Sequence, residues 1–572
     1  MELQRLLAVA RGDEPADLVL RNLQLVDVLN HQVYPAAIAV CDGRIAAIDK
    51  ACRGHQEHDL QGGFVCPGLI DAHVHIESSM LHPAEFARAV VGHGVTTVIA
   101  NPHEIANVLG LAGIIYLLRA GEGAPLDILL TVPSSVPATD LATSGAILTT
   151  KDLLQLGQHA QVVGLGEMMD FPGVVAGKER LLKELSLFQG QVVDGHCPGL
   201  MGRDLQAYAA AGISSDHECA TVAEAEARLR NGMKLLLREG SAAHNLLDLL
   251  PLLSHHNERW ISLCTDDLSP ADLLTKGSID YLLRMAMAAG VPPITALRMA
   301  TLNPAEHYRL WDRGLLTPGR RADMLVVDSL SAFQPKNVYR AGQLVATKEQ
   351  LAEWAEEPPK DAAKLEDTVR VDWQRLDLKV VAKGSRMRVI GVIPDQLATA
   401  CRIMPAHIIE GLSLADPERD LLKMAVIERH HGSGRCGLGF VVGMGLRWGA
   451  MASTVAHDHH NLLVIGGDDQ SMLTAARAVA AVGGGQAVAF GDEVLALLSL
   501  PIAGLMSNGS IQQVAAAQEE LTSVARRLGC RLAEPFMSMS FLALEVIPEL
   551  KLTDRGLVQV RTMEFVPLFV ED

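Results

Sequence analysis

Aromatic residues are scarce in this chain, since Phe, Trp and Tyr together make up only 4% of its 572 residues. Its core must therefore be built mainly from Leu, Val, Ile, Ala and Met. Apolar residues reach 49% and charged residues 20%, which excludes an intrinsically disordered chain. The length exceeds that of one ordinary core, so we expect two or three domains.

Basic residues are also few: 49 Lys and Arg stand against 67 Asp and Glu, which gives a formal net charge of -18. Nucleic-acid binding usually requires a basic face, so that class of protein is excluded. No apolar stretch is long enough to span a bilayer. The first residues, MELQRLLAVARGDEP, predict a short amphipathic helix rather than a signal peptide. We therefore expect a cytoplasmic protein with neither nucleic-acid nor membrane partners.

The cysteines follow no pairing pattern: there are nine, an odd number, and no CxxC occurs among them. A disulfide framework is thereby excluded, and a reducing compartment fits best.

Two stretches of short β-type runs lie apart in the sequence. Residues 1–66 contain the predicted N-terminal helix and runs such as ADLVLRN and LQLVDVL, with a hairpin signal at Asp42-Gly43. Residues 318–346 have the same texture. We interpret both stretches as parts of one small β-domain that brackets the region between them.

The bracketed region, 67–317, repeats an apolar run followed by a helix-like stretch. Eight such runs occur, at 63–76, 94–100, 126–132, 161–166, 190–195, 212–216, 233–238 and 260–266. Several are apolar throughout, as strands of a parallel sheet covered on both faces are. Eight β-then-α units predict a (β/α)8 TIM-type barrel, although an open doubly wound sheet has a compatible spacing.

The rest of the chain forms a linker and a further domain. Residues 347–370, rich in Glu, Lys and Pro, predict a surface helix plus linker. Residues 371–572 mix helical and strand texture with glycine-dense turns, which predicts a C-terminal α+β domain. The expected class is therefore α/β, with a catalytic barrel, a bracketing β-domain and this additional domain.

Side chains of metal-binding type stand at the ends of the barrel runs. The first run carries an HxH pair, and on a strand residues i and i+2 face the same side, so both imidazoles can reach one ion. Such a pair is expected by chance about once among 21 histidines, and His457-Asp458-His459 is a second one. The position of the HxH pair at a strand end makes it more significant, because the carboxyl ends of barrel strands share one face, where active sites of this fold lie. The six candidate ligands are His73, His75, Glu167, His196, His217 and Asp266.

These residue types suit two divalent cations. Imidazole and carboxylate bind Zn, Mn and Fe, and the two oxygens of Glu167 can bridge two ions. A water shared by two metals supplies hydroxide near neutral pH. Asp266 can bind one metal and hydrogen-bond that water, which makes it the expected proton acceptor.

Long sequence motifs add a resemblance to a known family. The motifs PGLIDAHVHIESSM, NPHEIANVLG, GLGEMMDFPGV, DGHCPGL, REGSAA and LCTDD resemble the amidohydrolase superfamily, and within it the bacterial adenine deaminase branch. TVAHDHHNLLVIGG, LPIAGLMS and FLALEVIPELKLT extend the resemblance through the last domain. Many binuclear members carry a carboxylated lysine on the fourth strand, where this chain has Glu167, so hydantoinase-like enzymes are disfavoured.

The resemblance implies a function. Adenine and water would give hypoxanthine and ammonia, with hydroxide attacking C6 of the purine and Asp266 taking the proton. It implies two divalent metals, Mn or Fe before Zn, and we expect a homodimer. The rivals are a related binuclear amidohydrolase acting on another nucleobase or cyclic amide, and a non-catalytic scaffold, which would be expected to have lost ligands.

Several further residues carry open alternatives. His103, in NPHE, either contacts substrate or the metal ligands, or anchors its loop with Glu104. Glu239 either hydrogen-bonds the purine or forms a salt bridge with Arg238. Glu77, Ser78 and Ser79 either line the pocket or, as we favour, cap the following helix.

Two further features stay open in the same way. Asp267 faces away from Asp266 on a strand, so it is expected to support the ligands without binding metal. The cluster from His457 to His460 either closes the pocket, holds an extra metal or forms a polar interface.

Overall fold

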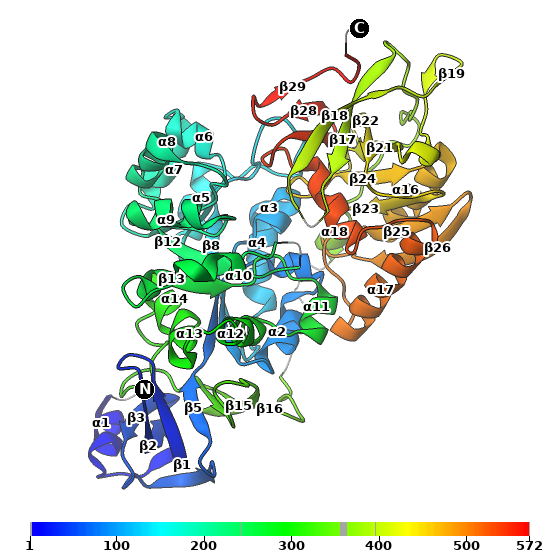
Figure 1. Cartoon of the computed structure of the whole chain (residues 1–572). Helices are drawn as coiled ribbons and strands as arrows, with labels where there is room; N and C mark the ends of the chain where they lie inside the picture. Colours follow the sequence, from blue (N-terminus) through cyan, green and yellow to red (C-terminus); the bar gives the residue numbers. More distant parts are fainter. Residues whose placement is uncertain (1–2, 242, 355–362, 395, 571–572) are drawn as a thin grey trace.

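This computed structural model describes residues 3–241, 243–354, 363–394 and 396–570. Three bodies are visible in Figure 1: a small β-domain with the N-terminus, a central α/β body, and a C-terminal domain that carries the other end of the chain. The α/β class and the additional β-sheet domains expected from the sequence are confirmed. Residues 355–362 of the predicted helix and linker lie outside the described residues.

The β-domain is one sheet built from two distant parts of the chain. Its strand order is β16-β15-β14-β5-β1-β2-β3, with β4 paired to β1. The predicted hairpin is confirmed: Cys41 pairs with Arg44, and Asp42 and Gly43 between them have φ values of 48° and 75°. The strands are β1 (Ala16–Asp27), β2 (Gln32–Cys41), β3 (Arg44–Ile48), β4 (Gly54–Asp59), β5 (Phe64–Pro67), β14 (Met324–Val327), β15 (Pro335–Arg340) and β16 (Gln343–Thr347). Helix α1 (Leu3–Arg11) buries Leu6 and Val9 against this sheet.

The central body contains a curled parallel sheet in two sections, ordered β10-β9-β8-β7-β6 and β11-β12-β13. The sections meet at both edges, because Asp266 N donates to His73 O at 3.0 Å and Ser214 N donates to Val193 O at 2.8 Å. The strands are β6 (Leu69–Val74), β7 (Val95–Ala100), β8 (Asp127–Pro133), β9 (Val162–Met168), β10 (Val192–Gly195), β11 (Ser215–Asp216), β12 (Lys234–Arg238) and β13 (Ile261–Cys264).

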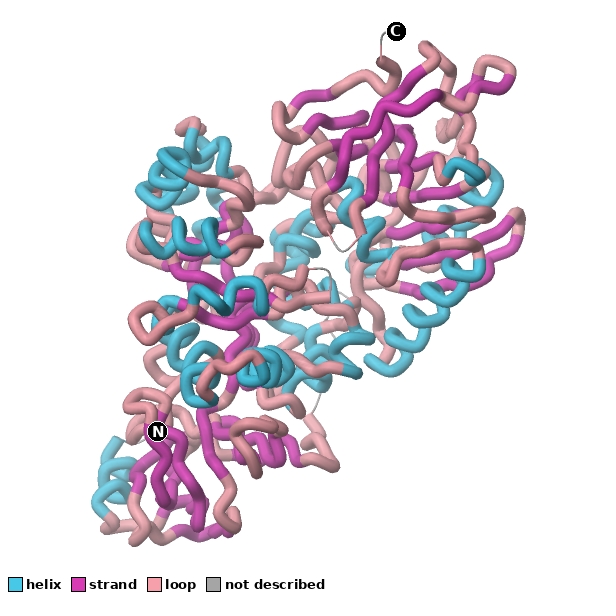
Figure 2. Tube along the Cα trace, viewed as in Figure 1, coloured by secondary structure: helices cyan, strands magenta, loops and turns pink. Residues whose placement is uncertain are grey.

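Helices alternate with these strands and lie outside them (Figure 2). They are α2 (Pro83–Val91), α3 (His103–Leu109), α4 (Leu111–Ala120), α5 (Thr150–Leu156), α6 (Phe171–Val175), α7 (Glu179–Leu187), α8 (Gly202–Ala210), α9 (Val222–Arg230), α10 (Leu246–Leu249), α11 (Pro270–Thr275), α12 (Ile279–Ala288), α13 (Pro293–Met299) and α14 (Leu302–His307). Among the described residues, no helix combines the length and apolarity needed to cross a membrane.

The first predicted run, 63–76, is two strands in two different sheets. Strand β5 pairs with β14 in the β-domain, whereas β6 pairs with β7 in the central sheet. The chain changes sheet at Gly68, where a Cβ atom would lie 2.3 Å from Thr96 Oγ1. Only glycine allows this close approach, so a continuous apolar pattern conceals the break.

The C-terminal domain is an eight-stranded sheet, ordered β18-β17-β22-β21-β24-β23-β25-β26. Its strands are β17 (Arg386–Val392), β18 (Thr399–Pro405), β21 (Leu422–Ile427), β22 (Cys436–Val442), β23 (Ala450–Ser453), β24 (Leu462–Gly466), β25 (Gly485–Phe490) and β26 (Glu493–Ser499). Helices α16 (Asp469–Ala481) and α17 (Ile511–Arg527) pack on it, and shorter elements are α15 (Ala363–Glu366), α18 (Pro535–Ser540), β19 (Ile408–Ile409), β20 (Leu412–Ser413), β27 (Leu550–Thr553), β28 (Gly556–Gln559) and β29 (Glu564–Phe565).

This domain is fastened to the loops that follow the first central strands. Ser507 N donates to Met80 O at 2.8 Å, after β6. Thr143 Oγ1, after β8, donates to Asp554 Oδ2 at 2.6 Å. The C-terminal domain therefore covers part of the face at which the central strands end, and this is the face of the candidate ligands.

Candidate metal centre and active site

The HxH pair is arranged to present two lone pairs to one point. His73 and His75 lie at and just beyond the end of β6, and their Nε2 atoms are 3.2 Å apart. His75 Nδ1 lies 3.0 Å from the carbonyl oxygen of Asn101, to which it must donate. In the neutral ring its Nε2 therefore carries the lone pair, as in metal-binding histidines whose other nitrogen is held by a carbonyl group.

Glu167 stands between two pairs of imidazoles. Its Oε1 lies 3.1 Å from His75 Nε2 and 3.2 Å from His73 Nε2. Its Oε2 lies 3.0 Å from His196 Nδ1 and 3.7 Å from His217 Nε2. His196 follows β10 and His217 follows β11, so strands from both sections of the sheet contribute. One carboxylate thus faces two separate sets of nitrogen donors.

Asp266 closes the group from the end of β13. Its Oδ1 lies 3.2 Å from His75 Nε2 and 3.6 Å from His73 Nε2. Both Glu167 and Asp266 have positive φ values, 23° and 57°. Such backbone conformations are costly for residues other than glycine and concentrate at functional sites, where surrounding structure imposes them.

Burial and charge together explain the protonation of this cluster. Burial alone would raise the pKa of Glu167, but the charge of His75 and the hydrogen bonds from His196 and His73 hold that pKa well below its usual range. Burial alone would lower the pKa of His73, but Asp266 and Glu167 raise it to about 9. In the absence of a cation, protons on the imidazoles therefore balance the buried carboxylates.

The geometry fits divalent metal binding. Two overlapping groups of buried donor atoms, each lying within 4.8 Å of one another, are His73, His75, Asp266 and His73, Glu167, His217. Directed imidazole nitrogens and carboxylate oxygens at this spacing are what Zn, Mn and Fe require. The structure thus brings all six candidate ligands into one buried cluster.

Three neighbours of this cluster were not predicted from the sequence to be site residues. Glu218 Oε1 lies 3.5 Å from both His196 Nδ1 and His217 Nε2. Arg238, at the end of β12, donates to Glu218 and, at 2.8 Å, to Asp266 Oδ2. Asn101 Nδ2 donates to Glu167 Oε1 at 2.7 Å. Each lies at or beside a strand end, which is the signal that marks the ligands themselves.

His103 adjoins the cluster. Its ring meets that of His75 edge-on at 4.7 Å, and its Nδ1 lies 3.6 Å from Glu167 Oε1. On its other side, His103 Nε2 lies 3.2 Å from Glu104 Oε1. Both alternatives for this residue are therefore compatible with the geometry: it anchors Glu104 and it also borders the ligands.

Glu239 does not pair with Arg238, whose donors go to Glu218, Asp266 and Asn245. Its Oε1 lies instead 2.8 Å from His244 Nδ1, in a small hollow lined also by Leu268 and Asp272. The salt-bridge alternative from the sequence is thus wrong, because Arg238 turns toward the more deeply buried carboxylates.

The expectation that Glu77, Ser78 and Ser79 cap the following helix is also wrong. They form a buried 3-10 turn, Ile76–Ser79, and His82 occupies the N-cap of α2. Glu77 Oε1 accepts from Ile105 N, in the first turn of α3, at 3.1 Å. Ser78 Oγ donates to Asp267 Oδ1, and the charge of Asp267 acts on His75.

The histidines of the C-terminal domain reach the same region. His457 Nδ1 lies 2.5 Å from Glu104 Oε1, and His460 Nε2 contacts Glu104 Oε2. Asp458 Oδ1 lies 3.5 Å from His103 Nε2. All are buried. The loop from His457 to His460, here called the histidine loop, therefore packs against the candidate centre.

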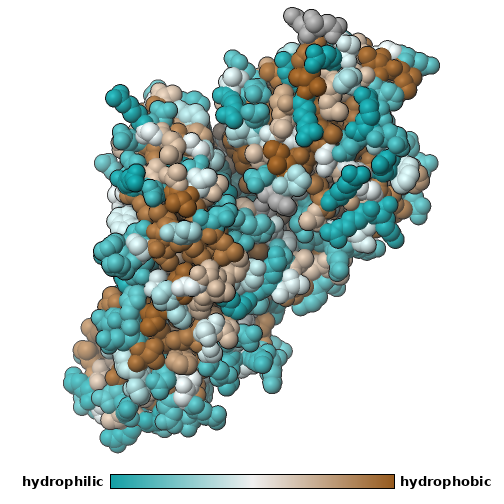
Figure 3. All heavy atoms as spheres, in the orientation of Figure 1, coloured by the Kyte–Doolittle hydropathy of each residue, from teal (hydrophilic) through white to brown (hydrophobic). Residues whose placement is uncertain are grey.

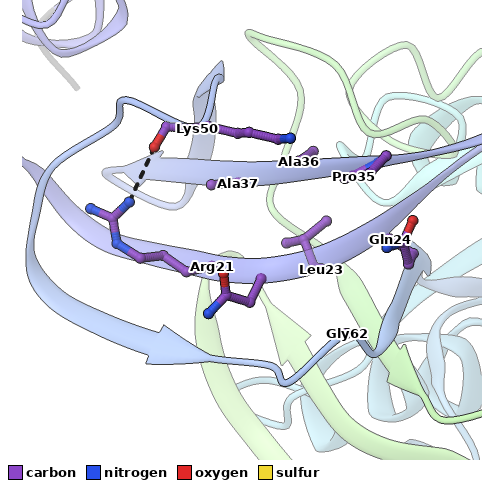
Figure 4. Close-up of a pocket in the computed structure, with 9 residues that line it drawn as sticks. Arg21, Leu23, Gln24, Pro35, Ala36, Ala37, Lys50 and Gly62 are labelled. Carbon is purple, nitrogen blue, oxygen red and sulfur yellow. Dashed lines mark hydrogen bonds between the residues drawn. The ribbon is translucent and has the colours of Figure 1, made fainter.

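One pocket, in the β-domain, is separate from this centre. A pocket on β1 and β2 of the β-domain is lined by residues such as Arg21, Gln24 and Lys50 (Figure 4). Arg21 Nη1 donates there to Lys50 O at 3.3 Å. Figure 3 shows a further hollow between the upper parts of the central body and the C-terminal domain. The β-domain pocket contains none of the ligand clusters described above.

Known families match most of the chain. Residues 64–345 match the amidohydrolase family, and residues 396–564 match the adenine deaminase C-terminal domain. The adenine deaminase of Desulfatibacillum aliphaticivorans is 48% identical over 568 residues, which is 99% of each chain. Adenine deaminase 2 of Carboxydothermus hydrogenoformans is 46% identical, also over 99% of each chain. The adenine deaminase of Kosmotoga olearia is 44% identical over 100% of this chain and 99% of its own.

Identity at this level over the full length of these relatives is far above what a shared fold alone requires. The resemblance seen in the motifs is thus confirmed over nearly the whole chain. The chain belongs to the adenine deaminases of the amidohydrolase family.

Proposed function

We propose that this protein is an adenine deaminase, which converts adenine and water to hypoxanthine and ammonia at the buried cluster around Glu167. The observation that carries the proposal is the position of the Glu167 carboxylate, with His73 and His75 at one oxygen and His196 and His217 at the other. Full-length identity to adenine deaminases supports the choice of substrate.

The fold that we propose for the central body is a closed (β/α)8 barrel spanning 67–317. The hydrogen bonds of Asp266 N to His73 O and of Ser214 N to Val193 O support this closure. In such a barrel the carboxyl ends of all eight strands surround one opening, which explains how residues from five strand ends converge.

Two divalent cations, Mn or Fe before Zn, are the proposed cofactors. His73, His75 and Asp266 would hold one cation and His196 and His217 the other, with Glu167 reaching both. When bound, such cations act as Lewis acids and make hydroxide available near neutral pH.

Side chains of the protein would accept and transfer the protons of the reaction. Asp266 is the proposed proton acceptor, since one of its oxygens faces the imidazoles while Arg238 holds the other at 2.8 Å. Burial alone would raise the pKa of Asp266, but the hydrogen bonds from His73 and His75 and the charge of Arg238 keep it well below its usual range. The carboxylate is therefore ionised at neutral pH, as a proton acceptor must be.

Two further side chains complete the proposed site. His103 borders Glu167 and is placed to contact substrate or steady the ligands. Glu239 stands at the end of β12, on the same edge of the sheet, and stays a candidate for a hydrogen bond to the purine.

Ammonia release from a panel of free purines and pyrimidines tests the proposed function. We expect release from adenine in the metal-loaded protein and none from cytosine. Release from another base but not from adenine would overturn the proposal. A homodimer is the proposed assembly, which light scattering can measure.

A further inference from the structure

The histidine loop contains two buried polar atoms that the protein leaves without a partner. Among the described residues, His457 Nε2 and Asp458 Oδ2 have no hydrogen-bond partner. Both residues are buried, with 3% and 4% of their surface exposed. Leaving such an atom unsatisfied is costly, so it usually marks the place of a ligand or an ordered water.

The neighbouring side chains of the loop are bonded at both ring nitrogens. His459 Nδ1 accepts from Asn461 N at 3.1 Å, and its Nε2 lies 3.3 Å from Ala543 O. His460 Nδ1 accepts from Ala456 N at 3.2 Å, and its Nε2 contacts Glu104. The two open atoms are therefore specific to positions 457 and 458.

These contacts argue against a third metal at Glu104, His457 and His460. Because His460 Nδ1 accepts from a backbone N–H, the proton of a neutral His460 ring lies on Nε2, toward Glu104. A cation at that position would need the lone pair of Nε2 and would force Nδ1–H against Ala456 N–H. We therefore interpret the three side chains as a hydrogen-bonded support for the loop.

The support fixes the orientation of His457. Its Nδ1 donates to Glu104 Oε1 at 2.5 Å, and its ring stacks on Phe541 with centroids 4.7 Å apart and planes 9° apart. Burial alone would lower its pKa, but the charge of Glu104 and the hydrogen bond to it raise that pKa to about 9, so Nε2 carries a proton at neutral pH. His457 Nε2 is thus available as a hydrogen-bond donor, and Asp458 Oδ2 is available as an acceptor.

Asp458 lies close to the candidate metal centre. Asp458 Oδ1 lies 3.5 Å from His103 Nε2, and His103 Nδ1 lies 3.6 Å from Glu167 Oε1, so one imidazole ring separates Asp458 from the ligands. When C6 of adenine lies at the metal ligands, N3 and N9–H form the opposite edge. That edge is an acceptor beside a donor, the complement of His457 and Asp458.

We propose that the C-terminal domain recognises the purine: Asp458 Oδ2 accepts N9–H, and His457 Nε2 donates to N3. This inference rests on the proposed function and deepens it. It assigns selection of the free base to the histidine loop, because a substituent on N9 would remove the N–H that Asp458 accepts.

Matched variants and a substrate analogue test the assignment. His457→Asn keeps a donor near the position of Nδ1, for Glu104, but has no atom at the position of Nε2. We expect kcat/KM for adenine to fall about 10- to 100-fold, which is the loss of one charge-assisted hydrogen bond. In the wild type 3-deazaadenine, which lacks N3, should be disfavoured relative to adenine. In His457→Asn the preference for adenine over 3-deazaadenine should shrink by the same factor as that by which kcat/KM for adenine falls.

Asp458→Asn is tested by equilibrium binding, which requires no turnover. We expect the dissociation constant of hypoxanthine, which shares the N3 and N9–H edge, to rise about 10-fold or more. His459→Asn is the control, since both nitrogens of His459 are bonded within the protein. It should lower Tm while leaving the analogue preference and the hypoxanthine constant unchanged.

The possible failures are distinguishable. If the wild type releases no ammonia from adenine, both the proposed function and this inference are refuted. If the wild type is active but both variants bind hypoxanthine normally and keep the full 3-deazaadenine penalty, the inference alone is overturned. Loss of bound metal in His457→Asn would also overturn it, because His457 would then be a ligand.

Discussion

Arg238 holds Asp266 from the side away from the imidazoles: its Nη1 lies 2.8 Å from Asp266 Oδ2, while Asp266 Oδ1 lies 3.2 Å from His75 Nε2. The same guanidinium contacts Glu218, which approaches His196 and His217. The buried guanidinium of Arg238 therefore orients two carboxylates, Asp266 beside one oxygen of Glu167 and Glu218 beside the imidazoles at the other. This makes Arg238 a positioning residue for the proposed reaction.

Arg238→Gln should shift the acidic limb of the kcat/KM profile to higher pH. Burial alone raises the pKa of Asp266 and the charge of Arg238 opposes that rise, so removing the charge raises the pKa of the proton acceptor. Asp266 must be ionised to accept a proton, and activity would then be lost at a higher pH. Arg238→Lys retains the charge and should shift the limb less. An unchanged limb in Arg238→Gln would refute this role.

Asp266→Asn should keep the fold but lose most turnover, on the order of 100-fold or more, because general-base catalysis typically contributes that much. Asparagine preserves the shape of the side chain but is a very weak base. Ammonia release measures the loss, and circular dichroism checks the fold. Activity within a few fold of wild type would exclude Asp266 as the proton acceptor.

His196→Asn should lower the amount of metal bound per chain, since His196 Nδ1 faces the Glu167 oxygen that lies away from the HxH pair. Elemental analysis of the purified protein measures this directly. His307→Asn is the matched control, because His307 is equally buried but pairs with Asp194 outside the cluster. Full metal content in His196→Asn would remove it from the ligand set.

The sequence predicts the ligands better than their neighbours, and strand geometry explains why. Parallel strands that end at one face bring their last side chains together, so His73, Glu167 and Asp266 could be found from the apolar runs alone. Glu218 could not, because strict alternation on a strand turns it away from His217. Strand β11 ends at Asp216, so both residues lie in irregular backbone where alternation no longer applies.

The C-terminal contribution has no local signal of this kind. Glu104 and His457 are 353 positions apart, and no periodicity links a loop of one domain to a strand end of another. The sequence motif identified the histidine loop as unusual, but left interface, pocket and metal roles open. The purine-binding role proposed for this loop rests on its pattern of bonded and open nitrogens, which only coordinates provide.

Asp127→Asn should destabilise the junction of the central body with the β-domain. Asp127, which begins β8, contacts Arg313, Arg321 and Arg340. Burial alone would raise its pKa, but these three charges lower it from 3.8 to about 2. Its contribution to stability is therefore complete above pH 3.8 and is lost as the pH falls toward 2.

The measurement is Tm of the variant and the wild type between pH 7 and pH 3. We expect a lower Tm for Asp127→Asn at pH 7, since the neutral amide loses the attraction of three partly buried guanidinium groups, about 2 kcal/mol at 1.36 kcal/mol per pKa unit. The difference in Tm between wild type and variant should narrow toward pH 3, where folding is stabilised less by the low pKa of Asp127. A difference independent of pH would show that packing, and not charge, sets the effect.

Metal binding should release protons and strengthen as the pH rises toward 9. Burial alone would lower the pKa of His73 and of His196, but the carboxylates around them, Asp266 and Glu167 for the first and Glu218 and Glu167 for the second, raise each pKa to about 9. Below that pH the metal-free cluster holds protons that a cation must displace, so the apparent affinity for Mn²⁺ increases with pH.

Calorimetric titration of chelator-treated protein in buffers of different ionisation heat counts the released protons. His196→Asn should release fewer than the wild type, because one displaceable proton is gone. A binding heat that does not depend on the buffer would mean that these imidazoles are already neutral, and the charge balance argued for the cluster would be wrong.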